Sequence, residues 1–317
     1  MDVTLEFDHL NTYCPVCLSK DILEKSLLSN IGFMSVPGVW HSQCLTCGSY
    51  FVNPQPTEDS LHLFYRSNQT EDEVEEKILS SSVDRYFNPT KKEYFLNHRV
   101  KPIKKYLQPD ASMIDIGCGA GTFVRFMKDE GFGAEGIDIS KRSIEFGIRK
   151  LNLDNHLHVC HWNGLKQDNQ TYDLVTIWTL LEHLKEPEEL IKFTAEVLKA
   201  EGYLIIEVPT VDSLLFDVMK ENYFWMMPPY HLFLFSVRGL KDMLNRNGFD
   251  VIEEYKMPSN WNFISSICKS LDIEYEFQFV VDSKLKSIFN QADKIFDQIA
   301  HQNGLNSTVQ LICRLRK

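Results

Sequence analysis

The sequence predicts an α/β protein with a doubly wound, seven-stranded sheet, preceded by a small cysteine-containing ribbon. Three observations lead to this prediction. Short apolar segments alternate with amphipathic helical segments from about residue 110 to the end of the chain, which is the pattern of a mostly parallel sheet covered by helices on both faces. A glycine-rich turn follows the first of these strands, and two Cys-x-x-C pairs lie near the amino end.

The composition of the 317 residues is that of an ordinary globular protein, with 44% hydrophobic and 24% charged residues. No apolar run reaches the roughly 18 residues of a membrane span. The acidic amino end, Met1 to Glu6, lacks the basic and apolar parts of a secretory signal. The formal net charge of −11 opposes binding to phosphate backbones. We therefore expect a cytoplasmic protein that binds neither nucleic acid nor membranes.

Two Cys-x-x-C pairs, Cys14/Cys17 and Cys44/Cys47, predict a structural zinc site. Zinc favours a tetrahedron of thiolates in structural sites, and each pair presents two sulfur atoms from one tight turn. Four cysteine ligands leave no position for a catalytic water. The alternative interpretations are a redox pair or four unrelated thiols. His41 is a further candidate ligand, but we expect it to be a surface histidine.

The chain divides into three predicted regions, which are a zinc-ribbon module at 1–57, a helical connector at 58–108 and the large α/β domain at 109–317. A module as small as the first region requires a metal or a similar cross-link to fold. The connector contains an acidic run at 71–76. Within the large domain, the aromatic segment at about 210–235 is expected to form a lid.

The strands of the large domain are expected at 112–116, 134–139, 157–160, 172–178, 203–208, 250–256 and 309–315. Pro187 is expected in the first turn of one intervening helix. Ser236 is expected to cap the next helix, which Gly248 ends. The last strand should be antiparallel and complete one edge of the sheet. The tail at 273–303 should form a strand and a helix at that edge, or a homodimer contact.

The turn after the first strand, from Asp115 to Gly121, indicates a ligand site. Glycine lets a ligand approach the backbone closely, and the helix that follows presents unpaired N–H groups. A nicotinamide dinucleotide usually requires G-x-G-x-x-G, whereas here Asp115 would repel a pyrophosphate and suits an ammonium group. Asp138 ends the second strand, where an acid can accept hydrogen bonds from a ribose.

These motifs, with Tyr172-Asp173-Leu174-Val175 and Leu181-Glu182-His183-Leu184, resemble those of class I S-adenosylmethionine-dependent methyltransferases. The resemblance covers about residues 85–257, and the ubiquinone-pathway O-methyltransferases form the most similar branch. It implies a Rossmann-like methyltransferase sheet, S-adenosylmethionine as cofactor and a small-molecule methyl acceptor. It also implies the cofactor-binding residues Asp115, Gly117, Gly119, Gly121, Asp138, Ile139, Asn163, Trp178 and Thr179.

Two histidines, His183 and His231, are candidates for the base that accepts a proton from an acceptor hydroxyl. Histidine titrates near neutral pH and can do this work. A hydrogen-bonded structural role is the alternative for each of them. The resemblance further implies that Glu182 and His183 help to bind a divalent ion, as this segment does in some ubiquinone-pathway relatives.

The predicted function is methylation of a sugar or another hydroxylated metabolite at oxygen. The ribbon followed by Phe51-Val52-Asn53-Pro54 and a helix is similar to the amino-terminal modules of bacterial methyltransferases that act on sugars. C- or N-methylation of a nucleotide sugar is one alternative. The further carboxy-terminal domain of sugar C-methyltransferases is not found, which speaks against C-methylation. A zinc-ribbon adaptor with a non-catalytic methyltransferase fold is the other alternative.

Overall fold

The computed structural model describes residues 5–28, 39–67, 72–168, 170–257, 264, 266–267, 270 and 283–316. All structural statements below concern these residues. The strand expected in the tail before residue 283 lies outside them, as does residue 71 of the acidic run.

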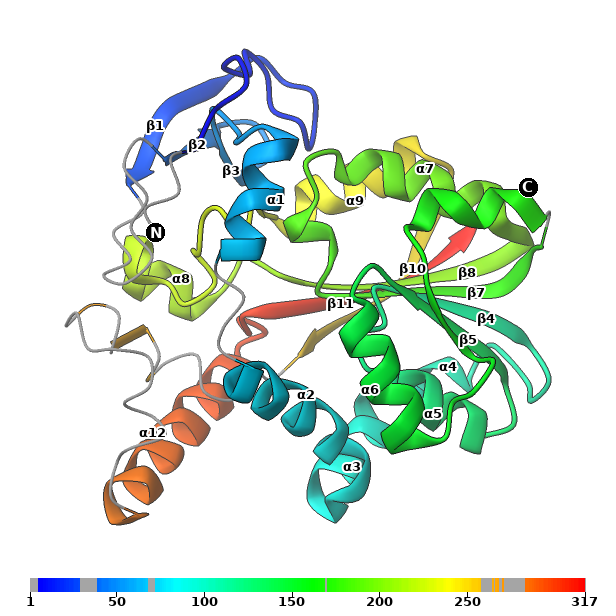
Figure 1. Cartoon of the computed structure of the whole chain (residues 1–317). Helices are drawn as coiled ribbons and strands as arrows, with labels where there is room; N and C mark the ends of the chain where they lie inside the picture. The colour runs from blue at the N-terminus through cyan, green and yellow to red at the C-terminus, as the bar shows by residue number, and fades with distance from the viewer. Residues whose placement is uncertain are drawn as a thin grey trace.

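The large sheet has seven strands in the order β10–β11–β8–β7–β4–β5–β6 (Figure 1). The strands are β4 (Ser112–Ile116), β5 (Gly133–Asp138), β6 (Leu157–Val159), β7 (Tyr172–Trp178), β8 (Leu198–Pro209), β10 (Phe249–Met257) and β11 (Thr308–Leu315). Each predicted strand is therefore present, and the predicted α/β class with a seven-stranded sheet is confirmed.

The place of the antiparallel strand differs from the prediction. β11 pairs antiparallel with both β8 and β10, so it lies inside the sheet and β10 forms the edge; the prediction that the antiparallel strand completes the edge was wrong. Burial explains this order. β11 is buried from Thr308 through Cys313, whereas β10 is buried only at its two ends and alternates between partly buried and exposed residues along most of its length, as a strand at an edge can.

Helices cover both faces of the large sheet (Figure 1). α7 (Pro187–Val197) and α9 (Val237–Arg246) lie on one face, and α5 (Thr122–Asp129) and α6 (Lys141–Leu151) lie on the other. Pro187 occupies the first turn of α7, as predicted. The Ser236 hydroxyl accepts a hydrogen bond of 3.0 Å from Gly239 N and caps α9, which is also as predicted.

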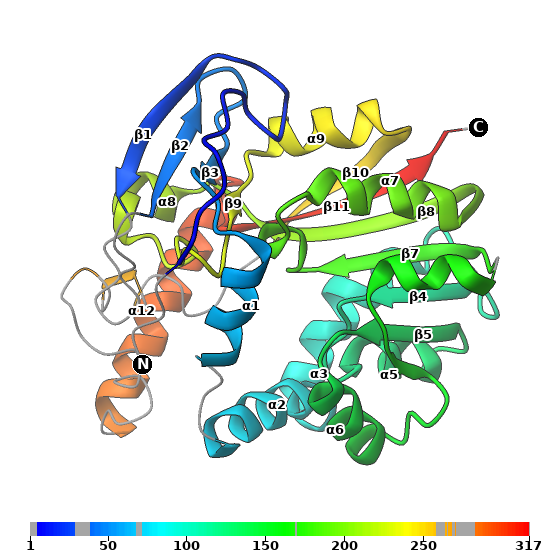
Figure 2. The same cartoon turned by 45° about the horizontal axis from the view of Figure 1, so that its top comes forward.

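The amino-terminal strands form a second sheet of four strands in the order β1–β2–β3–β9 (Figure 2). They are β1 (Ile22–Leu28), β2 (Trp40–Cys44), β3 (Tyr50–Val52) and β9 (Phe233–Leu234). β9 comes from the segment predicted as a lid, and it pairs antiparallel with β3. The ribbon is therefore joined to the large domain by backbone hydrogen bonds as well as by packing.

Further helices make up the connector and the remaining segments. The connector contains α1 (Glu58–Ser67), α2 (Asp72–Phe87), α3 (Pro89–Phe95), the π-helical turn η1 (Leu96–Val100) and α4 (Lys101–Ile103). The others are η2 (Trp162–Asp168), η3 (Leu181–His183), α8 (Leu214–Met219), η4 (Lys220–Asn222) and α12 (Ser283–Gln302). α2 packs against α5 and α6, which places the connector beside the glycine-rich turn.

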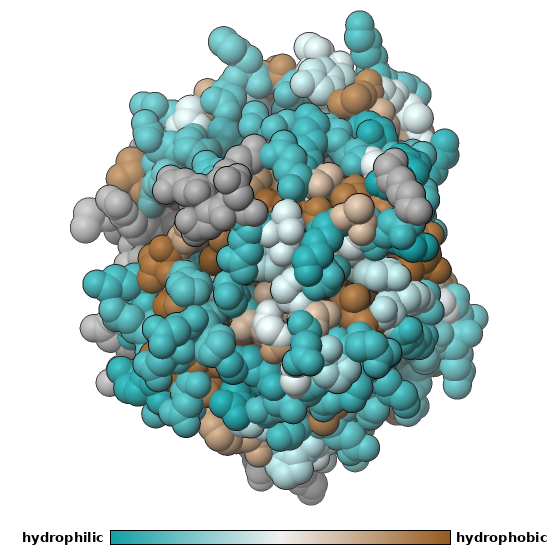
Figure 3. All heavy atoms as spheres, turned by 90° about the vertical axis from the view of Figure 1, so that its right-hand side faces the viewer, coloured by the Kyte–Doolittle hydropathy of each residue, from teal (hydrophilic) through white to brown (hydrophobic). Residues whose placement is uncertain are grey.

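The face shown in Figure 3 is mostly hydrophilic, with its apolar residues in small patches. Among the described helices, none has both the length and the apolar character that a membrane crossing needs.

Candidate functional site

The glycine-rich turn leaves β4 and enters α5 with three residues in the left-handed region. Gly117, Gly119 and Gly121 have φ values of 74°, 55° and 70°, which favour glycine. A methyl group on Gly121 would lie 2.6 Å from Leu157, so this glycine permits tight packing. A methyl group on Gly119 would meet no described atom within 4 Å. The space above Gly119 is thus open to a ligand.

Asp138 lies next to this turn, at the carboxyl end of β5. Its Oδ2 accepts a hydrogen bond of 2.9 Å from Gly119 N, and its Oδ1 accepts one of 2.8 Å from Ser140 N. The neighbouring Ile139 has 69% of its side chain exposed. Asp138 and Ile139, both predicted to bind the cofactor, therefore lie beside the glycine-rich turn.

Asp115 ends β4 beneath the turn and is buried. The Thr176 hydroxyl on β7 donates a hydrogen bond of 2.6 Å to Asp115 Oδ1. Burial raises the pKa of the Asp115 carboxyl to about 7 because it disfavours the charged form. Asp115 is therefore partly protonated near neutral pH, and a cationic group nearby would favour its ionised form.

Trp178 and Thr179 follow at the end of β7. Thr179 has a φ of 48°, which is unusual for a β-branched residue and costs free energy. Its N–H donates a hydrogen bond of 2.8 Å to Glu207 O on the adjacent β8. Trp178 packs against Phe123 of α5, with 4.8 Å between ring centroids. The strained backbone thus lies at the strand end where two of the predicted cofactor-binding residues stand.

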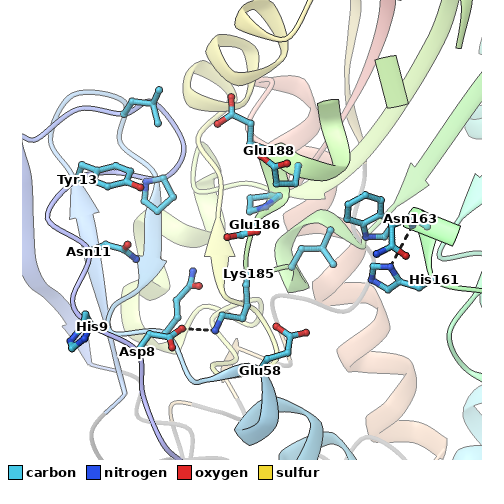
Figure 4. Close-up of a pocket in the computed structure, with 17 residues that line it drawn as sticks. Asp8, His9, Asn11, Tyr13, Glu58, His161, Asn163, Lys185, Glu186 and Glu188 are labelled. Carbon is cyan, nitrogen blue, oxygen red and sulfur yellow. Dashed lines mark hydrogen bonds and ion pairs between the residues drawn. The ribbon is translucent and has the colours of Figure 1, made fainter. Parts of the chain in front are cut away.

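A polar groove with a volume of about 750 Å³ runs between the ribbon and the large domain (Figure 4). His161 and the predicted cofactor-binding residue Asn163 line one wall of the groove. The ribbon supplies the opposite wall, where Asp8 forms an ion pair of 2.5 Å with Lys185. The remaining charged residues of the lining are the acids Glu58, Glu186, Glu188 and Glu189. This lining is unfavourable for a diphosphate.

The two predicted candidates for a base, His183 and His231, lie side by side, with 4.6 Å between ring centroids. Nδ1 of His183 lies 2.7 Å from Tyr230 O, and Nδ1 of His231 lies 2.7 Å from Trp225 O. Because a carbonyl oxygen only accepts, each Nδ1 carries the hydrogen, and Nε2 of the neutral ring can accept a proton. Burial lowers the pKa of His183, which keeps this ring neutral at pH 7.

Glu182 joins these two histidines in one cluster. One potential ligand atom from each of the three residues lies within 4.8 Å of the others. The Glu182 side chain is fully buried, and among the described residues neither carboxylate oxygen has a hydrogen-bond partner. Burial raises the pKa of Glu182 to about 8. An unsatisfied buried carboxyl is costly, so this position is suited to a proton or a cation.

The four predicted cysteine ligands come together in the ribbon. All four sulfur atoms lie within 4.8 Å of one another, with Cys14 and Cys47 at 3.9 Å and Cys17 and Cys44 at 3.4 Å. Val16 N and Cys47 N point to Sγ of Cys14 and Cys44 at 3.4 Å. A hydrogen bond from Cys14 lowers the pKa of the Cys47 thiol to about 5. Each Cys-x-x-C pair thus forms one tight turn, a knuckle, and the two knuckles face each other.

His41 differs from its prediction. It is fully buried, so the expectation of a surface histidine was wrong. The reason is its place in β2, where it is opposite Val52 of β3 and Leu27 of β1 in the middle of the four-stranded sheet. It does not belong to the described metal-ligand groups.

Three residues that the sequence analysis missed surround the same strand ends. They are Thr176, which bonds Asp115, and the pair Arg99 and Glu207, which are 2.5 Å apart. Glu207 could have been noticed as an acid at the end of a predicted strand. Arg99 had no comparable signal, because only the tertiary packing of η1 brings it to β8.

Residues 89–254 match a family model described as a methyltransferase domain. The ubiquinone biosynthesis O-methyltransferase of Coxiella burnetii (strain RSA 493 / Nine Mile phase I) is 25% identical over 174 residues, covering 51% of this chain and 74% of that protein. The enzyme of the same description from Bartonella tribocorum (strain CIP 105476 / IBS 506) is 24% identical over 209 residues, covering 60% and 83%.

Two solved structures resemble the chain in fold. One is a chain of the complex between the Haloferax volcanii Trm112 methyltransferase activator and a methyltransferase, with a TM-score of 0.51, 14% identity and coverage of 74% of this chain and 94% of that chain. The other is described as a sarcosine dimethylglycine methyltransferase from Galdieria sulphuraria, with a TM-score of 0.50, 14% identity and coverage of 71% and 86%.

Proposed function

Because this chain belongs to the methyltransferase domain family and is an S-adenosylmethionine-dependent methyltransferase, we propose that it methylates a hydroxyl group of a small-molecule acceptor. The observation that favours oxygen as the methylated atom is the pair of adjacent imidazoles of His183 and His231 beyond the end of β7, because a hydroxyl acceptor needs a base to remove its proton. The similarity to proteins described as O-methyltransferases supports the same choice.

The sulfonium of the cofactor supplies an activated methyl group. The acceptor oxygen would take this methyl group, and the electron pair of the carbon–sulfur bond would remain on sulfur. The hydroxyl proton passes to Nε2 of His231 or His183, which the Nδ1 hydrogen bonds hold in the tautomer that can accept it. The protein's main contribution to the rate is to hold the acceptor oxygen in line with the methyl group.

The predicted cofactor residues fit S-adenosylmethionine. The open space at Gly119 leaves room for the methionine part next to Asp115, and the carboxylate of Asp138 with the exposed Ile139 suits the ribose and adenine. We assign the remaining predicted contacts, Asn163 to the adenine side and Trp178 with Thr179 to the methyl group.

We expect Asp138→Ala to weaken binding of S-adenosylhomocysteine by about 1–3 kcal/mol, because charged hydrogen bonds to the ribose are lost. Isothermal titration calorimetry measures this change. Asp154→Ala, which removes an exposed acid after α6, is the control and should bind like the wild type. Equal affinity of the Asp138 variant would remove this residue from the site.

The affinity for S-adenosylhomocysteine should rise with pH through about pH 7 and then level off. The ammonium group of the ligand favours ionised Asp115, whose pKa in the free protein is raised to about 7, so binding expels a proton below that pH. Calorimetry at several pH values measures the effect. Asp115→Asn should remove the dependence, and a persistent slope in this variant would assign it to another group.

We infer that Cys14, Cys17, Cys44 and Cys47 hold one zinc ion. Zinc–sulfur bonds of about 2.3 Å in a tetrahedron separate the sulfur atoms by about 3.8 Å, and the Cys17–Cys44 and Cys14–Cys47 sulfur pairs, at 3.4 and 3.9 Å, lie on either side of this value. Bound zinc would fix the two knuckles against each other. Its four thiolate ligands give it a structural role.

The cluster of Glu182, His183 and His231 also fits a divalent cation, which would satisfy the buried carboxylate. One carboxylate and two imidazoles suit manganese, iron or zinc better than magnesium. Such an ion would occupy Nε2 of both histidines, because their Nδ1 atoms bond carbonyl oxygens. In this alternative the ion lowers the pKa of the acceptor hydroxyl in place of a histidine base. Titration of the zinc-loaded protein with Mn²⁺ tests this assignment, and Glu182→Gln should abolish the binding.

The acceptor is sought by mass spectrometry of a metabolite extract incubated with the protein and S-adenosylmethionine. We expect a product with the mass gain of one methyl group, about 14 Da, on a hydroxylated metabolite. A product methylated at carbon or nitrogen would contradict O-methylation. Binding of S-adenosylmethionine without any product would favour the non-catalytic adaptor.

A further inference from the structure

We propose that Gln310 and Glu207 bind the methyl acceptor and select a neutral ring that carries several hydroxyl groups, such as a sugar ring. This inference rests on the proposed function, because it names the class of acceptor for the same methyl transfer. Gln310 lies on β11 and Glu207 on the adjacent β8. Neither belongs to the predicted cofactor residues or to the candidate bases.

The two side chains lie in one row across the large sheet. Gln310 is the direct partner of Glu207 in the antiparallel pair of β11 with β8, and Glu207 is the partner of Trp178 in the parallel pair of β8 with β7. Direct partners on neighbouring strands project to the same face of a sheet. Trp178 packs against Phe123 of α5, so the row lies on the face that α5 covers (Figure 1). Its Trp178 end is the strand end assigned to methyl transfer.

The polar atoms of this row are buried and lack partners. Gln310 is fully buried, and among the described residues neither its Oε1 nor its Nε2 has a hydrogen-bond partner. Glu207 is 6% exposed, and Arg99 contacts its Oε1 at 2.5 Å. The other oxygen, Oε2, has no hydrogen-bond partner within the same part of the chain. Buried polar groups without partners destabilise a fold, so their concentration in one row indicates a binding site.

Side chains from two helices lie near the row and are less deeply buried. Burial raises the pKa of Tyr94 on α3 to about 12, and the negative charges of Glu207 and Asp297 add to this shift, so these three side chains lie near one another. Tyr94 and Asp297, which lies on α12, are both partly exposed. Asp297 Oδ2 is buried and has no hydrogen-bond partner among the described residues. A ligand would therefore reach the row between α3 and α12.

The balance of donors and acceptors selects the ligand. The three oxygens without partners, from Gln310, Glu207 and Asp297, require donors, and the amide nitrogen of Gln310 requires an acceptor. A carboxylate has no donor, and Glu207 would repel it. An ammonium group has no acceptor, and Arg99 would repel it. A hydroxyl group both donates and accepts, so a neutral ring with several hydroxyls satisfies every atom, whereas a catechol has fewer hydroxyl hydrogens than the oxygens require.

Saturation-transfer NMR titrations of the full-length protein with bound S-adenosylhomocysteine test the proposal. The probe is myo-inositol, a neutral ring with a hydroxyl on every carbon. Cyclohexylamine, cyclohexanecarboxylate and catechol are compared with it, because they keep a six-membered ring and change its charge or its number of hydroxyls. The titrations are made at about pH 8, because burial raises the pKa of Asp297 to about 7 and its carboxylate is ionised above that value. We expect myo-inositol to bind at least about fivefold more tightly than each of the others.

Gln310→Leu is the informative variant, because leucine fills a similar volume without polar atoms. We expect it to weaken binding of myo-inositol about tenfold or more, as for lost hydrogen bonds, and to leave the affinity for S-adenosylhomocysteine within about twofold. It should also raise the midpoint of thermal unfolding, because it removes a buried amide without partners, whereas the loss of a purely structural glutamine would lower it. Gln108→Leu, at an exposed position before β4, is the matched control and should weaken neither ligand. Gln310→Met, whose side chain is closer in shape, should show the same loss and replaces the leucine variant if that variant does not fold.

Tighter binding of catechol, the amine or the carboxylate than of myo-inositol would overturn the choice of ligand. Absence of myo-inositol binding to the wild type, or binding that survives both substitutions of Gln310, would overturn the site even if S-adenosylhomocysteine binds. The proposed function fails in a different way. Myo-inositol binding that depends on Gln310, in a protein that methylates only carbon or nitrogen atoms of metabolites, would support the site and contradict O-methylation.

Discussion

Replacing His231 by alanine is expected to lower kcat by about 10²- to 10⁴-fold, the usual contribution of a general base. His231 is buried at 3% exposure and lies against His183, and its Nδ1 hydrogen bond to Trp225 O prepares Nε2 to accept the acceptor proton. The measurement uses the acceptor found by mass spectrometry.

A second variant separates catalysis from folding. In His231→Asn the amide nitrogen can replace Nδ1 as donor to Trp225 O, but the side chain cannot take up a proton near neutral pH. We expect the same loss of kcat with S-adenosylhomocysteine affinity within about twofold of the wild type. His158→Ala, at an exposed position of β6, is the control. A kcat within about fivefold of the wild type in His231→Asn would transfer the role of base to His183.

The parts of the site that the sequence predicted are those determined by neighbouring residues. The glycine turn at 117–121 needs its left-handed residues whatever packs around it, and Asp115 and Asp138 belong to strands that are visible as short apolar segments. The four cysteines likewise form two turns, each complete within a few residues. Such local patterns predict the same local structure whichever distant segments pack against them.

The parts that escaped prediction depend on contacts between distant segments. Glu182 lies close to His231 because Leu232 N donates a hydrogen bond of 2.8 Å to Glu182 O. No local sequence pattern predicts that contact. Arg99 reaches Glu207 through the packing of η1. β11 lies between β8 and β10 because β10 tolerates an exposed edge better than β11 does. This order follows from comparing the two strands with each other, and the hydrophobic pattern of one strand does not predict it.

Removal of zinc is expected to affect the active site as well as the ribbon. The second knuckle is attached to the start of α9, because the Ser236 hydroxyl donates a hydrogen bond of 2.6 Å to Cys47 O and its N–H donates one of 3.0 Å to Ser49 Oγ. β9 pairs with β3 just before this point, and His231 precedes β9 by two residues. Loosening of the knuckles therefore frees the segment that holds His231.

We expect Cys44→Ser to lose the zinc ion, about one per wild-type chain, and to destabilise the protein by several kcal/mol, since structural zinc sites in small modules contribute much of the folding free energy. Methyl transfer should fall with it, while S-adenosylhomocysteine still binds, because Asp138 and the glycine turn are bonded to each other within the large sheet and not to the ribbon's sheet. Metal analysis, thermal unfolding and calorimetry measure the three effects. Cys160→Ser, outside the cluster, should keep zinc and stability. A zinc-free Cys44 variant with the thermal stability and hydrogen-exchange protection of the wild type at 230–236 would show that the ribbon needs no metal to hold His231.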